Sequence, residues 1–160
     1  MKVVVLGIGN ILLSDEGVGV RAVDALVERW TLPPEVKVID GGTMGMELLD
    51  HIAGAGHLVV VDAVRAHRPP GTVFKLTGDE VPAFFKTKLS PHQIGLSDVL
   101  ATLILTDEQP VSLALVGVQP VTLGTNMALS PEVEAKIDEV IALIIEEIEG
   151  QGLTATRKGA

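Results

Sequence analysis

Two carboxylates and one imidazole stand where the sequence changes from one predicted element to the next. Glu16 lies on the loop after the first predicted strand, Asp62 directly follows another strand, and His92 begins a helix. Residues at such places of an open parallel sheet meet outside the carboxyl ends of its strands. We therefore expect Glu16, Asp62 and His92 to converge on one open site.

One nitrogen and two oxygen ligands leave coordination positions open and suit zinc, nickel or iron better than calcium. The chain has no cysteine, which excludes disulfides, thiolate zinc sites and a cysteine nucleophile. It also lacks the H-E-x-x-H helix pattern, which disfavours an ordinary zinc metalloprotease. Each candidate has a simpler structural explanation as well, because carboxylates and capping groups are common at helix starts.

Asp40 is a fourth candidate, because it follows a predicted strand and precedes Gly41-Gly42-Thr43. This segment is either a turn and nothing more, or it places a supporting carboxylate or a backbone binding surface beside Asp62. No serine stands in a G-x-S-x-G pattern, which disfavours a serine hydrolase. The remaining histidines lie in no recognisable ligand pattern and are expected at the surface or in packing: His51, His57 and His67.

A glycine-rich turn after the first strand also raises the possibility of nucleotide binding. Gly7 and Gly9 match the first two glycines of a dinucleotide-binding pattern, but the third position is Leu12. Asp15 and Glu16 would also occupy the helix start that a pyrophosphate needs. A nucleotide-binding oxidoreductase is therefore the weakest of the functions considered.

Strand and helix patterns alternate along the chain, which predicts an α/β fold. We expect a three-layer α/β/α sandwich around a twisted, mostly parallel sheet of about five strands. Residues 1–149 would form a single domain, and residues 150–160 a disordered tail. The expected strands are 2–6, 36–39, 58–61, 72–76 (at a sheet edge) and 112–118; the expected helices are 17–30, 46–53, 90–105 and a last one opening at Ser130-Pro131.

Composition narrows the function classes further. The net charge of −9 disfavours general binding to nucleic acid or to anionic membranes. No apolar stretch reaches the roughly 20 residues that span a bilayer, and no secretion signal is recognisable. We therefore expect a cytoplasmic protein, and a monomer.

Several segments of the chain resemble, in order, those of the [NiFe]-hydrogenase maturation proteases. The first is the pattern G-x-G-N-x-L-x-x-D-E-G-x-G at residues 7–19, and the likeness extends over about residues 3–145. Each segment is weak alone, but their shared order is specific. The other segments are 40–43, 61–63, 90–93, 117–120 and 129–131.

This resemblance implies an endopeptidase that removes a C-terminal extension from a hydrogenase large-subunit precursor after nickel insertion. Cleavage would follow a His or Arg, and Glu16, Asp62 and His92 would contact the metal. Asp40, Glu16 and Asp62 would be the catalytic carboxylates, in an aspartic-type enzyme without a D-T-G sequence; which one acts as base stays open. Nickel would come from the substrate, with zinc or cadmium as substitutes and no nucleotide. The alternative is a non-catalytic nickel-recognition or chaperone module of hydrogenase assembly.

Overall fold

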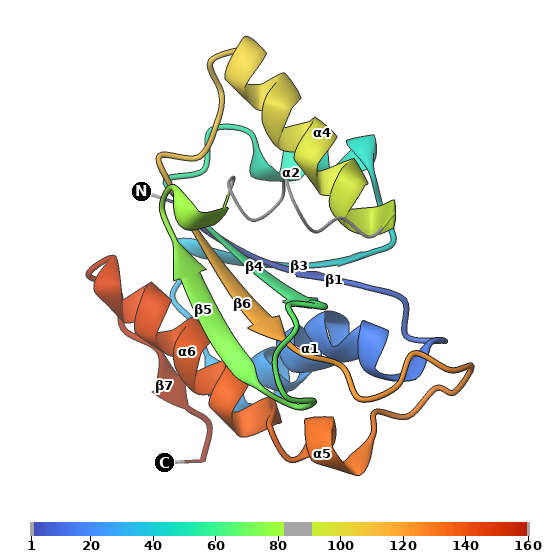
Figure 1. Ribbon diagram of the computed structural model, residues 1–160. Coiled ribbons are helices and arrows are strands. Elements are labelled where there is room, and N and C mark those ends of the chain that lie inside the picture. Colours follow the sequence, from blue (N-terminus) through green and yellow to red (C-terminus); the bar gives the residue numbers. More distant parts are fainter. Residues whose placement is uncertain (1, 82–90, 160) are drawn as a thin grey trace.

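The computed structural model describes residues 2–81 and 91–159, with the side chains of 91–95 outside the description. Five strands form one sheet in the order β3-β1-β4-β6-β5 (Figure 1). β5 pairs antiparallel with β6, and the other pairings in this sheet are parallel. The mostly parallel sheet and the edge position of the fourth predicted strand are thus confirmed. The strands are β1 (Val3–Ile8), β3 (Val36–Gly42), β4 (His57–Ala63), β5 (Val73–Thr77) and β6 (Ser112–Val118).

Helices cover both faces of the sheet and complete the predicted sandwich (Figure 1). On one face lie α1 (Val18–Arg29) and α6 (Ile137–Gly150), and on the other α2 (Leu49–Ile52) and α4 (Pro91–Leu105). Short turns of helix precede three of them: η1 (Ser14–Gly17), η2 (Met46–Leu48) and α5 (Pro131–Glu134). Within residues 2–81 and 91–159, none of the helices combines the length and the apolarity that crossing a bilayer requires.

Alternating side chains of the strands build two hydrophobic cores, one on each face. Val3 and Val5 of β1 pack with α1 and α6, whereas Val4 and Leu6 pack with α2 and α4. Both sets are fully buried. Continuous runs of Val, Leu and Ile are therefore required here, because each residue of the central strands faces a helix layer.

The last predicted helix is divided into two pieces. Ser130 caps α5 by accepting a hydrogen bond from the Val133 amide at 3.4 Å, as its place before Pro131 predicts. The chain then turns at residues 135–136 before α6 begins. The apolar residues predicted for one face are nevertheless buried in both pieces: Val133, Ile137, Val140, Ile141 and Ile144.

The prediction of a disordered tail after Gly150 is wrong. β7 (Thr156–Arg157) pairs antiparallel with β2 (Trp30–Thr31), which directly follows α1. Lys158 adds a backbone hydrogen bond to Arg29 and a side-chain hydrogen bond to the carbonyl of Val27. Leu153 and Ala155 pack against the core under α1 and α6. These hydrogen bonds and apolar contacts hold the segment in place although most of its residues are small or polar.

Candidate active site

The carboxyl ends of β1, β3 and β4 meet at one edge of the sheet. In the register of the strands, Gly7 of β1 stands between Asp40 of β3 and Val61 of β4. Asp62 comes one residue later, opposite Gly117 of β6. Asp40 and Asp62 therefore lie at the same edge, as the strand pattern predicts.

Asp40 and Asp62 nevertheless face opposite sides of the sheet. Side chains alternate along a strand, and Val38, on the side of Asp40, packs with the core of α1 and α6. Val60, on the side of Asp62, packs with the core of α2 and α4. Because β1 runs between β3 and β4, the two carboxylates are also about two strand spacings apart, roughly 10 Å. The interpretation that places Asp40 beside Asp62 is therefore wrong.

Glu16 reaches this edge on η1, the turn between β1 and α1, and η1 contacts β4. Its side chain is half-buried, whereas Asp62 is fully buried. A carboxylate that is removed from water needs a compensating partner, and both Glu16 and Asp62 have interaction partners in the structure. The fold thus brings two of the three predicted ligands to neighbouring elements.

Two glycines permit this close approach of η1 and α1 to the strand ends. Gly9 has a φ of +129°, and a Cβ there would overlap the carbonyl oxygen of Glu16. A Cβ at Gly19 would overlap the carbonyl oxygen of Val61 and come within 2.5 Å of that of Ile8. The glycine spacing seen in the sequence therefore has a packing cause at this edge.

Asp15 has a role that the sequence does not reveal. Its carboxylate is fully buried and accepts hydrogen bonds from the amides of Val121 (2.9 Å), Thr122 (3.1 Å) and Ser130 (2.7 Å). The Ser130 hydroxyl donates a fourth at 2.8 Å. Asp15 therefore ties η1 to the loop before α5, rather than simply favouring a helix start. A single sequence contains no signal that pairs these distant positions.

His92 is the second residue of α4, and its side chain lies outside the described residues. The helix itself packs on the face to which Asp62 points, through Leu96 and Val99. Figure 1 shows the first turn of α4 toward the side of the molecule where β1 and β4 end. Among the residues described with side chains, no three or more His, Cys, Asp or Glu gather closely enough to hold a metal ion. The three-ligand site stays a prediction.

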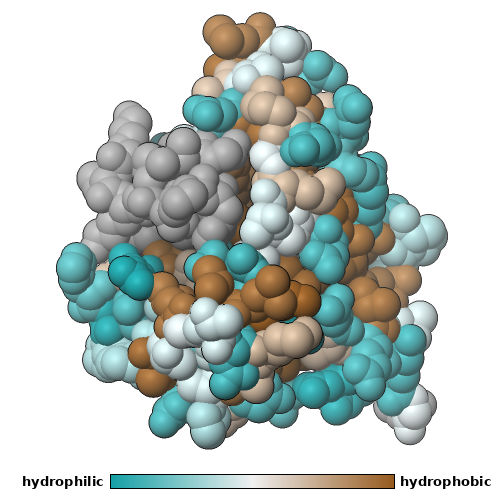
Figure 2. All heavy atoms as spheres, turned by 90° about the vertical axis from the view of Figure 1, so that its right-hand side faces the viewer, coloured by the Kyte–Doolittle hydropathy of each residue, from teal (hydrophilic) through white to brown (hydrophobic). Residues whose placement is uncertain are grey.

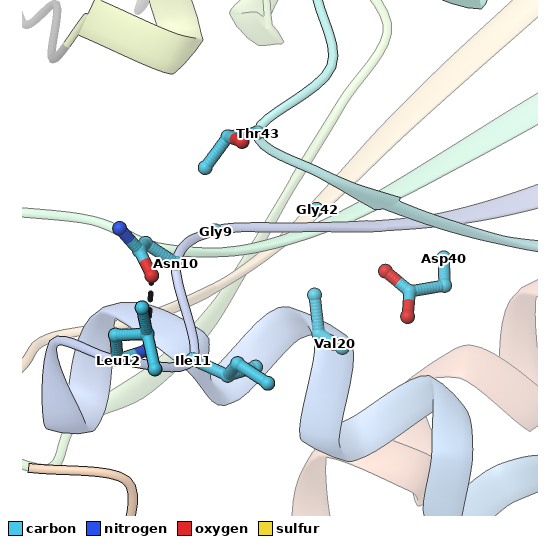
Figure 3. Close-up of a pocket in the computed structure, with 8 residues that line it drawn as sticks. All are labelled: Gly9, Asn10, Ile11, Leu12, Val20, Asp40, Gly42 and Thr43. Atoms are coloured by element: carbon cyan, nitrogen blue, oxygen red, sulfur yellow. Dashed lines mark hydrogen bonds between the residues drawn. The ribbon is translucent and has the colours of Figure 1, made fainter.

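A pocket of about 310 Å³ opens beside Asp40, on the other side of this edge (Figure 3). Asp40 contributes the charged group, and Val20 of α1 contributes an apolar wall. Asn10 is held in place by a hydrogen bond from the Leu12 amide to its side-chain oxygen, at 2.9 Å. Such a pocket suits a side chain with an apolar stem and a cationic end. Its lining is Gly9, Asn10, Ile11, Leu12, Val20, Asp40, Gly42 and Thr43.

The negative charge of Asp40 affects the pKa of Asp24, which lies one turn beyond Val20 on α1. Burial and, second, the charge of Asp40 raise the pKa of Asp24, while Arg21 opposes them. Two carboxylates thus repel each other on this side of the sheet. A cation placed between them would relieve that repulsion.

His51 and His57 lie away from the carboxyl edge, His51 beside Lys37 of β3, whereas His67 is on the loop that follows the carboxyl end of β4. His57, at the amino end of β4, is buried and bonds Ser112 Oγ through Nδ1 (2.6 Å) and Glu147 through Nε2 (2.9 Å). Lys75 also contacts Glu147, at 2.8 Å. This polar network joins β4, β5, β6 and α6, a structural role consistent with the packing expected of His57.

Comparison with known proteins gives one consistent result. A sequence model described as hydrogenase maturation protease matches residues 20–147. The hydrogenase 2 maturation protease of Escherichia coli (strain K12) is 46% identical, over 100% of this chain and 98% of its own. The hydrogenase expression/formation protein HupD of Rhodobacter capsulatus is 44% identical, over 99% of this chain and 76% of its own.

Solved structures show the same similarity. The hydrogenase maturating endopeptidase HybD from Escherichia coli superposes with a TM-score of 0.95 at 46% identity, covering 99% of this chain and 98% of its own. The [NiFe] hydrogenase maturation protease HybD from Thermococcus kodakarensis reaches 0.79 at 28% identity, covering 92% of this chain and 99% of its own.

Proposed function

Because the chain belongs to the hydrogenase maturation protease family and is therefore a peptidase, we propose that it processes a [NiFe]-hydrogenase large-subunit precursor. It removes the C-terminal extension of that precursor after nickel has been inserted. The observation that supports this most directly is the contact between η1, which carries Glu16, and β4, which carries the buried Asp62. We place this activity in the cytoplasm and assign it to a monomer.

In this proposal the nickel belongs to the substrate and is the feature that the enzyme recognises. Glu16, Asp62 and His92 supply two carboxylates and one imidazole, with no thiolate. Such hard and borderline ligands hold nickel loosely compared with the cysteines of a precursor. The site therefore suits a protein that transiently contacts a nickel ion already bound by the substrate. Zinc or cadmium would bind the same ligands in vitro. No nucleotide takes part.

Asp62 and Asp40 face opposite sides of the sheet, so nickel recognition and recognition of the cleavage residue take place on different faces of the sheet edge. Glu16 and Asp62 orient the nickel-bearing part of the precursor, so that positioning supplies much of the rate. The Asp40 pocket holds the basic residue at the cleavage point, with the apolar stem against Val20. A water molecule then attacks the scissile carbonyl, and one of the three carboxylates accepts its proton. The same carboxyl group returns the proton to the leaving nitrogen as the C–N bond breaks, which releases the C-terminal extension with a free amine.

The test is a processing assay with purified protein and large-subunit precursor, loaded with nickel or free of it. Mass spectrometry follows the loss of the C-terminal extension. We expect shortening of the nickel-loaded precursor, and little or none without nickel. Alanine in place of Glu16 or His92 should abolish it. Nickel-dependent binding without any shortening would instead support the non-catalytic recognition module.

A further inference from the structure

Three large apolar side chains stand exposed beside the candidate site. Leu12 is 53% exposed, Val121 42% and Met127 61%. We call these three residues the apolar rim. Figure 2 looks onto this end of the molecule, and apolar side chains gather near the middle of the face.

The backbone under the apolar rim is firmly held. Asn126 forms an isolated bridge with Leu13, donating to the Leu12 carbonyl at 3.0 Å and accepting from the Ser14 amide at 2.7 Å. The Arg21 side chain donates to the Met127 carbonyl at 2.7 Å. Exposed apolar side chains on a fixed backbone are typical of protein–protein interaction surfaces, because little conformational entropy is lost on binding.

The apolar rim is continuous with both parts of the candidate site. Leu12 also lines the pocket that contains Asp40. The carboxylate of Asp15, next to Glu16 in the chain, holds the Val121 amide at 2.9 Å. A macromolecule that occupies the Asp40 pocket therefore contacts Leu12 of the apolar rim, and the loop that carries Val121 and Met127 is bonded to the same turn of the chain.

We propose that the apolar rim is the docking surface for the folded large-subunit precursor, in addition to the carboxylates and the imidazole that contact the nickel and the cleavage residue. This inference rests on the proposed function and names the part of the enzyme that selects its partner. The chain carries a net charge of −9, and Glu16 and Asp40 lie at this edge, with Arg21 as the cation that contacts the rim at Met127. The matching surface of the precursor is therefore apolar, with basic groups around it.

The experiment compares Val121→Glu and Met127→Glu with the wild-type enzyme on nickel-loaded precursor. A charge in the centre of an apolar contact should raise KM about tenfold, while kcat stays within about twofold. The matched control is Val111→Glu. Val111 is 83% exposed, and the residue after it begins β6 at the amino end of the sheet. This control adds the same charge and should leave KM unchanged.

Binding of the precursor, measured by calorimetry, separates this inference from the proposed function. If the wild-type enzyme binds but never shortens the precursor, the proposed function fails while the rim variants still test docking through Kd. Unchanged KM and Kd in both folded rim variants would overturn the inference. Analytical ultracentrifugation tests the other alternative by measuring the self-association of the rim variants. If self-association changes while precursor binding stays normal, the rim is a contact between two copies of the chain, and the inference is wrong.

Discussion

Asp15 and Ser130, which lie 115 positions apart in the chain, are joined by two hydrogen bonds to the Asp15 carboxylate, one from the Ser130 amide and one from its hydroxyl. Ser130 also caps α5. A single buried carboxylate therefore positions η1, the loop before α5 and the helix itself. Because Glu16 follows Asp15 directly, this pair also determines where Glu16 stands.

Replacing Asp15 with alanine should destabilise the protein by roughly 3–5 kcal/mol, because three amides and the Ser130 hydroxyl would lose their acceptor, and the two Ser130 groups are buried. For a domain of this size the loss corresponds to a fall in Tm of about 10 °C. Thermal unfolding followed by circular dichroism measures it. The control is Asp138→Ala, whose carboxylate is 83% exposed in its ion pair with Arg29 and which should change stability by about 0.5 kcal/mol at most. Equal effects of the two changes would contradict the role given to Asp15.

Gly19→Ala should damage both stability and processing. The new methyl group would meet the carbonyl oxygens of Val61 and Ile8, so that α1 must move away from the strand ends. We expect a loss of about 2 kcal/mol or more, measured by urea unfolding, and slower precursor shortening because η1 moves with α1. Gly150→Ala is the control, since a Cβ there meets no atom within 4 Å. A Gly19→Ala protein with normal stability and rate would show that the close approach is not required.

Buried strands with continuous apolar runs made the central sheet predictable, because each residue from Val3 to Leu6 must face one helix layer or the other. The strand ends likewise located Asp40 and Asp62. Which face each carboxylate takes depends on which alternate side chains of β3 and of β4 point toward α1 and α6. The expected strand ends did not specify this. Residues 150–159 are ordered because they contact Arg29 and Trp30, which lie far away in the sequence. The local composition of the segment therefore could not predict this structure.

Stability should fall in acid partly through Glu147. Burial would raise the pKa of this carboxyl, but hydrogen bonds and charges from Lys75 and His57 outweigh burial and lower it from the ordinary value of 4.5. A lowered pKa in the folded state means that the group stabilises the fold above pH 4.5, and that this contribution is lost as the pH falls through the folded value. Unfolding free energies measured between pH 7 and pH 3 should therefore decrease less steeply in Glu147→Gln than in the wild type.

Glu146 supplies the matched control for this pH dependence, because it pairs with the same Lys75 but is 64% exposed, against 14% for Glu147. Glu146→Gln should leave the acid slope close to that of the wild type, since solvent screens an exposed pair. Identical slopes in all three proteins would remove Glu147 from the explanation of acid unfolding.

Asp40→Asn should separate recognition of the cleavage residue from recognition of nickel. The variant keeps the shape of the pocket but loses its charge, so its preference for a basic residue over a neutral residue of similar size at the cleavage point should shrink about tenfold or more. Its dependence on nickel should persist, because Asp40 faces away from Asp62. Asp62→Asn should instead lower the rate on the nickel-loaded precursor to that on the nickel-free precursor, because Asp62 shares the nickel-orienting role of Glu16 and His92. Rates on precursors that differ only at the cleavage residue, with and without nickel, measure both effects.

Asp24 provides an internal check that the Asp40→Asn variant acts through charge. The charge of Asp40 helps to raise the pKa of Asp24, although burial is the larger cause. In Asp40→Asn the titration midpoint of Asp24, followed by carboxyl carbon NMR, should therefore move down toward 3.8 without reaching it. A midpoint that stays in place would mean that the two carboxylates do not interact, and any change in cleavage preference would then need a cause other than the field of Asp40.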